Sequence, residues 1–88
     1  MYYTYVLKSD RNFGYYIGYS SDVELRLKTH NSGTVIATKN LRPWRIFYVE
    51  EFQDEKDARA RERQIKSWKS RNAIEKLIFN KNRGSSIS

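Results

Sequence analysis

Arg26 and His30 are basic residues whose spacing could place them together on one side of a helix. They lie in the segment "DVELRLKTH", where Val23 and Leu27 begin an apolar stripe that His30 continues. Side chains three or four residues apart share a helix face, so Arg26 and His30 are expected at one edge of this stripe. A single histidine beside apolar neighbours is more often a packed residue than a reactive one. The arginine four residues before it favours the alternative, a site for an anion.

The strand-like run "YYIGYS", residues 15–20, leads directly into that helix and carries the next candidates. Strand alternation puts Tyr16 and Gly18 on one face, with Tyr15 and Ile17 on the other. A glycine inside a strand weakens it and often marks a close approach by a ligand or another backbone. A neighbouring helix or a β-bulge would explain Gly18 equally well. Tyr16 and Gly18 are therefore candidates for the wall of a site.

Glu62 is an acidic residue at a position where an apolar residue would fit better. It lies four residues after Ala58 and three before Ile65, which with Trp68 define the apolar stripe of a later helix. One interpretation is an ordinary helix ion pair, which contributes only about 0.2–0.5 kcal/mol. The other is a ligand for a hard divalent cation such as Mg²⁺, which binds oxygen donors and keeps waters and substrate phosphates around it.

The residue inventory removes several other kinds of site. The chain has no cysteine and one histidine, and it contains no H-x-x-x-H pair, no P-loop and no G-x-G-x-x-G motif. The sequence therefore lacks the residues and motifs that zinc hydrolases, thiol-dependent enzymes and nucleotide-binding loops require. The absence of cysteine, and of any apolar run near the roughly 20 residues of a membrane span, predicts a cytoplasmic protein.

Length and charge indicate a small domain with a polyanionic partner. The 88 residues include 17 Lys and Arg against 10 Asp and Glu, a net charge of +7, and 15% are aromatic. Basic side chains neutralise phosphates and aromatic rings stack on bases, so nucleic acid is the expected class of partner. A chain of this length builds one small core, so its site should be shallow. We expect a single domain over residues 1–80 and a disordered polar tail over residues 81–88.

Composition and turn residues predict three strands. Tyrosine-rich runs at 2–8 and 15–20 flank a short polar segment and are typical of a β-hairpin. Residues 45–52, "RIFYVEEF", predict the third strand. The segment 33–44 lacks a helical stripe and is expected to be a loop, with a strand fragment at Val35–Ile36.

Three helices are expected, each beginning at a capping residue. Side chains of Asp, Ser and similar residues accept hydrogen bonds from the free amides of a first helical turn, and glycine favours the residue after a last turn. The first helix is expected over residues 22–31, with Asp22 as its cap and Gly33 just after its end. The second is expected over about 54–69 with Asp54 as its cap, and the third over about 70–79 with Ser70 as its cap.

The order of elements is therefore ββαβαα, without an internal repeat or linker. Three strands are too few for a sandwich, and one helix interrupts them. This order predicts an α+β fold, a small three-stranded antiparallel sheet flanked by helices that cover one of its faces.

These residues together resemble the GIY-YIG nuclease family, and most closely its short stand-alone bacterial branch. Residues 3–5, "YTY", stand at the first tripeptide of the family and residues 16–18, "YIG", at the second. The helix arginine of the family falls on Arg26, its following histidine or tyrosine on His30, and its metal-binding glutamate on Glu62. A match in these separate parts is far more specific than "YIG" alone.

The resemblance covers residues 2–78 and has departures. Tyr3 and Thr4 replace the glycine and isoleucine of the first tripeptide, which leaves its tyrosine, Tyr5, in place. That change is expected to affect packing more than chemistry. Excision-repair relatives carry a lysine directly after the second tripeptide, where this chain has Tyr19, and one candidate activator is lost.

The resemblance implies a DNA endonuclease that depends on Mg²⁺ or Mn²⁺, with a role in DNA repair. Tyr5 and Tyr16 would line the site of phosphodiester hydrolysis, and Tyr16 or His30 would help to deprotonate the attacking water. Arg26 would neutralise charge on the phosphate, and Glu62 would hold the metal. The substrate would be DNA that is branched, nicked or damaged. Basic residues of the second helix are expected to contact it: Arg59, Arg63, Lys66 and Lys69.

Two other functions remain open from the sequence. The first is a nucleic-acid-binding module that keeps the fold but cuts weakly or not at all, as the loss of the lysine and the altered first tripeptide would suggest. The second is a basic adaptor that contacts proteins through Trp44, Tyr48 and Trp68.

Overall fold

The structure, a computed structural model, describes residues 1–77. Its centre is a three-stranded antiparallel sheet in the order β2-β1-β3, with β1 Tyr2–Ser9 between β2 Tyr15–Ser20 and β3 Trp44–Phe52. The three predicted strands are thus confirmed, and β1 and β2 form the predicted hairpin. The tail over residues 81–88 lies outside the described residues.

Helix α1 begins and ends where its capping residues predict. It spans Val23–Ser32, the Asp22 carboxylate accepts a hydrogen bond from the Leu25 amide at 3.0 Å, and Gly33 follows with φ of +85°. Only glycine adopts this left-handed conformation without strain, so it closes the helix.

The second and third helices also lie close to their predicted positions. Helix α2 spans Glu55–Trp68, and Asp54 stands at its N-cap without a side-chain capping bond, so the prediction that its carboxylate caps the helix is wrong. Residues 71–77 are helical, and the Ala73 amide donates to the Ser70 hydroxyl at 3.3 Å as expected of a cap. The predicted end of this helix near residue 79 lies outside the described residues.

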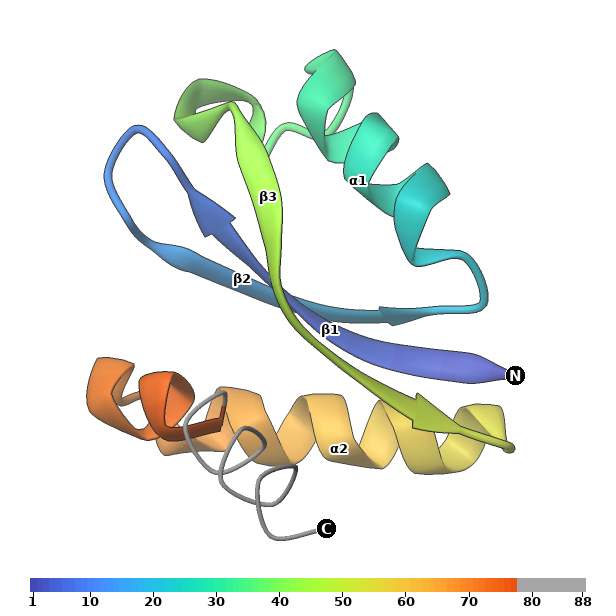
Figure 1. Ribbon diagram of the computed structural model, residues 1–88. Coiled ribbons are helices and arrows are strands. Elements are labelled where there is room, and N and C mark those ends of the chain that lie inside the picture. The colour runs from blue at the N-terminus through green and yellow to red at the C-terminus, as the bar shows by residue number, and fades with distance from the viewer. Residues whose placement is uncertain (78–88) are drawn as a thin grey trace, which may run out of the picture.

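The helices cover both faces of the sheet, which corrects the expectation that they cover one. Figure 1 shows α1 on one face and α2 on the other, and both helices contact all three strands. The reason is visible in β1, where the four consecutive residues from Thr4 to Leu7 are all buried. Alternating side chains point to opposite faces, so a fully buried run needs cover on both.

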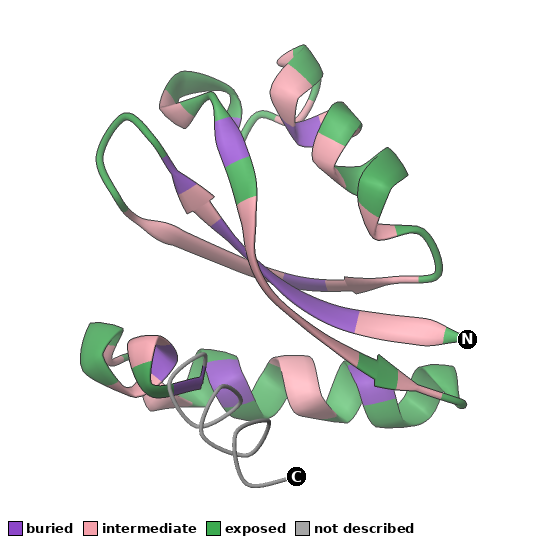
Figure 2. Ribbon diagram, viewed as in Figure 1, coloured by how far each residue is buried: buried purple, intermediate pink, exposed green. Residues whose placement is uncertain are grey.

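Two separate cores result from this arrangement (Figure 2). On the α2 face, Val6 packs with Ile65 of α2 and with Ile74 and Leu77 from the third helix. On the α1 face, the buried residues are Tyr5, Leu7 and Trp44. The fully buried residues of the α2 face are thus aliphatic, whereas those of the α1 face include two aromatic rings.

The connection from α1 to β3 contains a short 3-10 helix, η1, at Lys39–Leu41 and no strand. The Val35 carbonyl accepts hydrogen bonds from the amides of Thr38 and Lys39, which folds this segment into a turn. The predicted strand fragment at Val35–Ile36 is therefore wrong, because its backbone is used in local turns.

The aromatic residues considered as protein-contact anchors belong to the fold. Trp44 is 4% exposed and its indole N–H donates to the Thr38 carbonyl at 2.9 Å. Tyr48 is half-buried and donates to Glu50, while the Arg61 guanidinium lies 5.5 Å from the Trp68 ring centre. Each of the three therefore has a contact within the fold. Among residues 1–77, no helix is both long and apolar enough to cross a membrane.

Candidate active site

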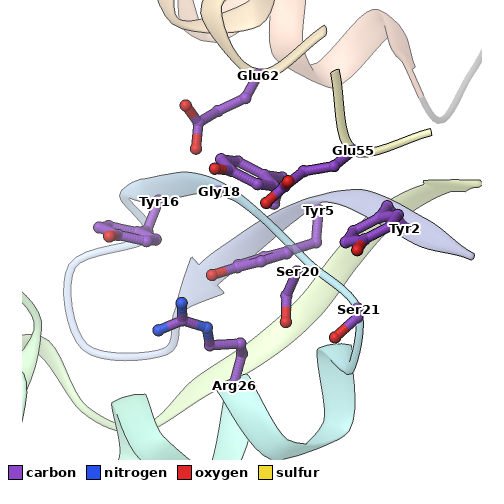
Figure 3. A pocket seen from close by; sticks show the side chains of 10 residues that line it. Tyr2, Tyr5, Tyr16, Gly18, Ser20, Ser21, Arg26, Glu55 and Glu62 are labelled. Carbon is purple, nitrogen blue, oxygen red and sulfur yellow. The ribbon is translucent and has the colours of Figure 1, made fainter. Parts of the chain in front are cut away.

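A pocket of about 340 Å³ lies at the β2 edge of the sheet, and four elements supply its walls. Figure 3 shows side chains directed toward it from β1 (Tyr5), β2 (Tyr16), α1 (Arg26) and α2 (Glu62). Because β2 is an edge strand, side chains from helices on opposite faces can meet around it. The structure thus brings together four of the five residues that the sequence singled out.

Thr4 ties α2 to the sheet directly beside Glu62. Its buried hydroxyl donates to the Ala58 carbonyl at 2.7 Å. That carbonyl lies one helical turn before Glu62, so the contact fixes the part of α2 from which the glutamate projects. Thr4, a departure from the family tripeptide, has a packing role as expected.

Gly18 is required by Tyr5 of the neighbouring strand. The two residues are paired across β1 and β2, and a Cβ atom on Gly18 would lie 2.5 Å from the Tyr5 hydroxyl oxygen and 2.7 Å from its Cζ. The close approach that the glycine allows is therefore made by a phenol ring rather than by a helix or a bulge. Any side chain at this position would displace the Tyr5 hydroxyl.

Tyr5 is a buried phenol that stays protonated over the ordinary pH range. It is 2% exposed. Burial, followed by the neighbouring Tyr16, raises the pKa of Tyr5 to about 12, and Arg26 opposes this only in part. Glu62 also raises the pKa of Tyr5, which reflects how close the carboxylate lies. At neutral pH, Tyr5 is suited to donating a hydrogen bond rather than to accepting a proton.

His30 lies behind the two tyrosines and does not line the pocket. It is 2% exposed. Its ring centre lies 4.6 Å from that of Tyr16 and 6.4 Å from that of Tyr5. Burial, and then the Arg26 cation, lower the pKa of His30 below its ordinary value. At neutral pH the histidine is therefore neutral and adds no second positive charge to that of Arg26. Its burial also argues against direct contact with an attacking water.

Arg26 supplies the positive charge of the pocket from α1. The residue is exposed, and its guanidinium extends from the helix toward the tyrosines (Figure 3). It acts on the pKa of both Tyr5 and His30 in the direction expected of a nearby cation. An anion in the pocket would meet this charge first.

Glu62 makes the ion pair expected on the helix and also lines the pocket. Its carboxylate lies 3.6 Å from the Lys66 ammonium one turn along α2, and its side chain is 16% exposed. The same carboxylate lines the pocket beside the tyrosines. No cluster of three or more His, Cys, Asp or Glu side chains occurs in residues 1–77, so any metal here would need oxygens from substrate and water.

Sequence reasoning missed several residues that line the pocket. Glu55 lies seven residues before Glu62, and two helical turns bring it to the same side of α2. That spacing was the available signal. Tyr19 also lines the pocket, at the position where excision-repair relatives carry a lysine. The remaining lining residues come from the beginning of β1 and the end of β2, and they carried no comparable signal: Tyr2, Ser20 and Ser21.

The basic residues of α2 divide between its two sides. Arg59 and Lys66 lie at helical spacing beside Glu62, and both are exposed. Arg63 and Lys69 are exposed as well. Arg61 is different, because its Nε lies 3.1 Å from the Glu50 carboxylate of β3, so it supports the fold. Arg61 is therefore engaged within the fold rather than directed toward DNA.

Comparison with known proteins agrees with this architecture. A model of the GIY-YIG catalytic domain matches residues 1–82. A UPF0213 protein of Staphylococcus haemolyticus is 39% identical over 67 residues, which cover 75% of this chain and 80% of that protein. A UPF0213 protein of Clostridium perfringens is 34% identical over 82 residues, or 92% of this chain and 86% of that one.

A solved structure supports the same grouping. The solution NMR structure of a UPF0213 protein from Bacillus halodurans is 31% identical to this chain and superposes with a TM-score of 0.58, covering 92% of this chain and 86% of that one. The family match spans nearly the whole chain, including both tripeptide strands and the helices that carry Arg26 and Glu62. The chain therefore belongs to the GIY-YIG family, a nuclease superfamily.

Proposed function

We propose that this protein is a divalent-metal-dependent endonuclease that hydrolyses DNA phosphodiester bonds. The observation that carries the proposal is the pocket itself, in which Tyr5, Tyr16, Arg26 and Glu62 meet from four different elements. A phenol donor, a guanidinium and a carboxylate in one pocket are the groups that phosphodiester hydrolysis needs. The net charge of +7 suits a polyanionic substrate.

The side chains take different roles in this proposal. Arg26 binds the scissile phosphate and offsets the charge that builds on its oxygens. Tyr5, whose pKa is raised to about 12, donates a hydrogen bond. Tyr16, in its phenolate form, would accept the proton of the attacking water and become a neutral phenol, and the positive charge of Arg26 lies in the same pocket. His30 acts only through the tyrosines, since it is buried behind them.

The carboxylate chemistry of the pocket fits Mg²⁺ or Mn²⁺. Glu62 would hold the ion, and Glu55 lies in the same pocket as a second oxygen donor. Hard divalent cations of this size are commonly held by one or two carboxylates together with waters and substrate phosphates. When bound, the ion would stabilise the leaving oxygen as a Lewis acid.

A second candidate is a nucleic-acid-binding module that cuts weakly or not at all. The observation that favours it is the contact between Lys66 and Glu62, which gives the carboxylate a structural partner. In that case Glu62 would neutralise a lysine rather than hold a metal. Both candidates predict DNA binding, so only cleavage distinguishes them.

The experiment is a cleavage assay with the purified protein on nicked, flapped, single-stranded and duplex DNA, each with Mg²⁺ and with EDTA. We expect Mg²⁺-dependent cleavage, with a preference for nicked or branched DNA. Binding to the same DNAs without cleavage under any divalent ion would instead support the binding module.

A further inference from the structure

A chain of buried polar groups runs from the pocket into the α1 face of the molecule. The Tyr5 hydroxyl lies 3.5 Å from His30 Nε2, and His30 Nδ1 lies 3.0 Å from the Thr38 hydroxyl. All three residues are at most 2% exposed. Within residues 1–77, no other group shares a hydrogen bond with the Tyr5 hydroxyl.

Thr38 is held rigidly at the far end of this chain. Its amide donates to the Val35 carbonyl at 3.1 Å, and its own carbonyl accepts from the Trp44 indole at 2.9 Å. The residue is completely buried. The position of the Thr38 hydroxyl is therefore set by the turn after α1 and by β3, independently of the pocket.

The contacts of Thr38 decide where its hydroxyl proton lies. The Val35 carbonyl already accepts from the amides of Thr38 and Lys39 at 3.1 and 3.0 Å, and the Thr38 hydroxyl is a more distant third donor at 3.4 Å. A carbonyl oxygen has two lone pairs, and both are engaged. The His30 Nδ1 is nearer, at 3.0 Å, which makes it the favoured acceptor of the Thr38 proton.

This placement fixes the tautomer of His30. Burial and the Arg26 cation lower the pKa of the imidazole, so the ring is neutral at neutral pH and carries a single proton. With Nδ1 accepting from Thr38, that proton would reside on Nε2, which faces the Tyr5 oxygen at 3.5 Å. A neutral imidazole has one donor and one acceptor nitrogen, so the two contacts are complementary.

We propose that Thr38 is a positioning residue that holds His30 in its Nε2–H tautomer, so that Tyr5 accepts from His30 and directs its own O–H into the pocket. In this arrangement Tyr5 offers a hydrogen-bond donor, and the natural acceptor is a non-bridging phosphate oxygen. The opposite tautomer would turn the Tyr5 proton back toward His30. The placement of the protons stands by itself, whereas the role toward phosphate rests on the proposed function.

The proton placement can be read directly by NMR because the chain has one histidine. Imidazole ¹⁵N shifts, measured on the uniformly labelled protein at pH 8 without DNA, separate a protonated from an unprotonated ring nitrogen. We expect Nδ1 to be unprotonated and Nε2 protonated. A ring protonated on Nδ1, or an even mixture of the two tautomers, would overturn the proposal.

Thr38→Val and Thr38→Ser form the matched pair that tests the role of Thr38. Thr38→Val removes the donor and should release the single tautomer, and Thr38→Ser should retain it. In cleavage assays Thr38→Val should lower kcat about 10-fold to 100-fold, as removal of an orienting partner typically does, while DNA affinity in EDTA is unchanged. Thr38→Val that keeps both the Nε2–H tautomer and the wild-type kcat would show that Thr38 does not position His30.

The NMR measurement and the cleavage assay together separate this inference from the proposed function. If the wild-type protein cleaves no DNA, the proposed function fails, and the imidazole spectrum still decides the proton placement. If Thr38→Val does not fold, the wild-type and Thr38→Ser spectra decide it. Either of these two proteins with its proton on Nδ1 would contradict the inference.

Discussion

The two faces of the sheet are packed by different kinds of side chain. On the α2 face, the fully buried cluster around Val6 and Ile65 is aliphatic, and the buried Thr4 hydroxyl bonds directly to the backbone of α2. On the α1 face, His30 and Thr38 are buried beside Tyr5 and joined to it by hydrogen bonds. A buried polar chain whose members are hydrogen-bonded to one another fixes the orientation of those members.

The difference suggests a division of work between the faces. The α2 face stabilises the fold and holds the helix that carries Glu62, whereas the α1 face sets the orientation of the phenol in the pocket. The pocket lies where the two meet, at the edge of β2. Changes in the aliphatic core of the α2 face should therefore affect stability first, and changes in the polar chain of the α1 face should affect the chemistry.

The largest effect on stability is expected from Ile65→Ala. The side chain is completely buried in the aliphatic core, and truncation of such a residue typically costs about 2–5 kcal/mol. Urea unfolding measures this loss. Cleavage per folded molecule should be close to that of the wild type below the melting temperature, and a loss of cleavage in a fully folded variant would contradict the division between the faces.

Gly18→Ala should affect both properties. The new Cβ would lie 2.5 Å from the Tyr5 oxygen, and relief of this overlap requires movement of a buried ring at a cost of about 1–3 kcal/mol. Displacement of a catalytic group by about 1 Å can lower the rate on the order of 100-fold. The nearby Gly14→Ala is the control, since its Cβ would meet only the Asn12 side chain, at 3.0 Å, in the exposed hairpin loop. Equal activity in the two variants would show that the position of Tyr5 does not matter.

The α1 face should also make stability depend on pH. His30 has a lowered pKa when folded, so the unfolded chain binds the additional proton. The neutral His30 therefore leaves the free energy of unfolding unchanged above about pH 6.5, the ordinary pKa of histidine. Below that pH the free energy of unfolding falls, because the unfolded chain takes up a proton more readily than the folded one. Melting curves between pH 8 and pH 5 measure the effect, with His30→Gln as the control that cannot titrate. Parallel curves for the two proteins would contradict a buried neutral histidine.

The smallest effects are expected from single charges on α2. DNA binding should weaken with salt by a log–log slope of about −0.9 per phosphate contact. Arg59→Gln should reduce that slope by about one contact, whereas Arg61→Gln should leave it unchanged and lower stability, because Arg61 is paired with Glu50. Fluorescence anisotropy titrations provide the slopes. The same slope change in both variants would mean that the two sides of α2 do not differ.

The sequence predicted the elements better than their layers. Capping residues such as Asp22 and Gly33 marked the ends of α1 because local chemistry decides them. The prediction placed helices on one face of the sheet only, although the unbroken run of apolar residues from Tyr5 to Leu7 indicated that both faces of β1 are covered. The strand expected at Val35–Ile36 failed because local turn hydrogen bonds outweighed the β-propensity of these residues.

The pocket could be predicted only in part. Tyr16, Arg26 and Glu62 were recognised from motif and spacing, and Glu55 could have been found from its place two turns before Glu62. Thr38 had no such signal. Its contact with His30 depends on the turn after α1, and no periodic pattern encodes that geometry.

The role of Glu62 is the central point of the proposed function, and Glu62→Gln tests it most directly. The change keeps the size of the side chain and removes the charge that a metal needs, and Glu51→Gln, an exposed glutamate outside the pocket, is the control for charge. We predict that Glu62→Gln loses Mg²⁺-dependent cleavage while its DNA affinity in EDTA stays the same or rises, because a negative charge facing the phosphates has gone. Cleavage that survives in Glu62→Gln at the same Mg²⁺ concentration, with only a small loss of melting temperature, would contradict the account and leave Glu62 as the ion-pair partner of Lys66.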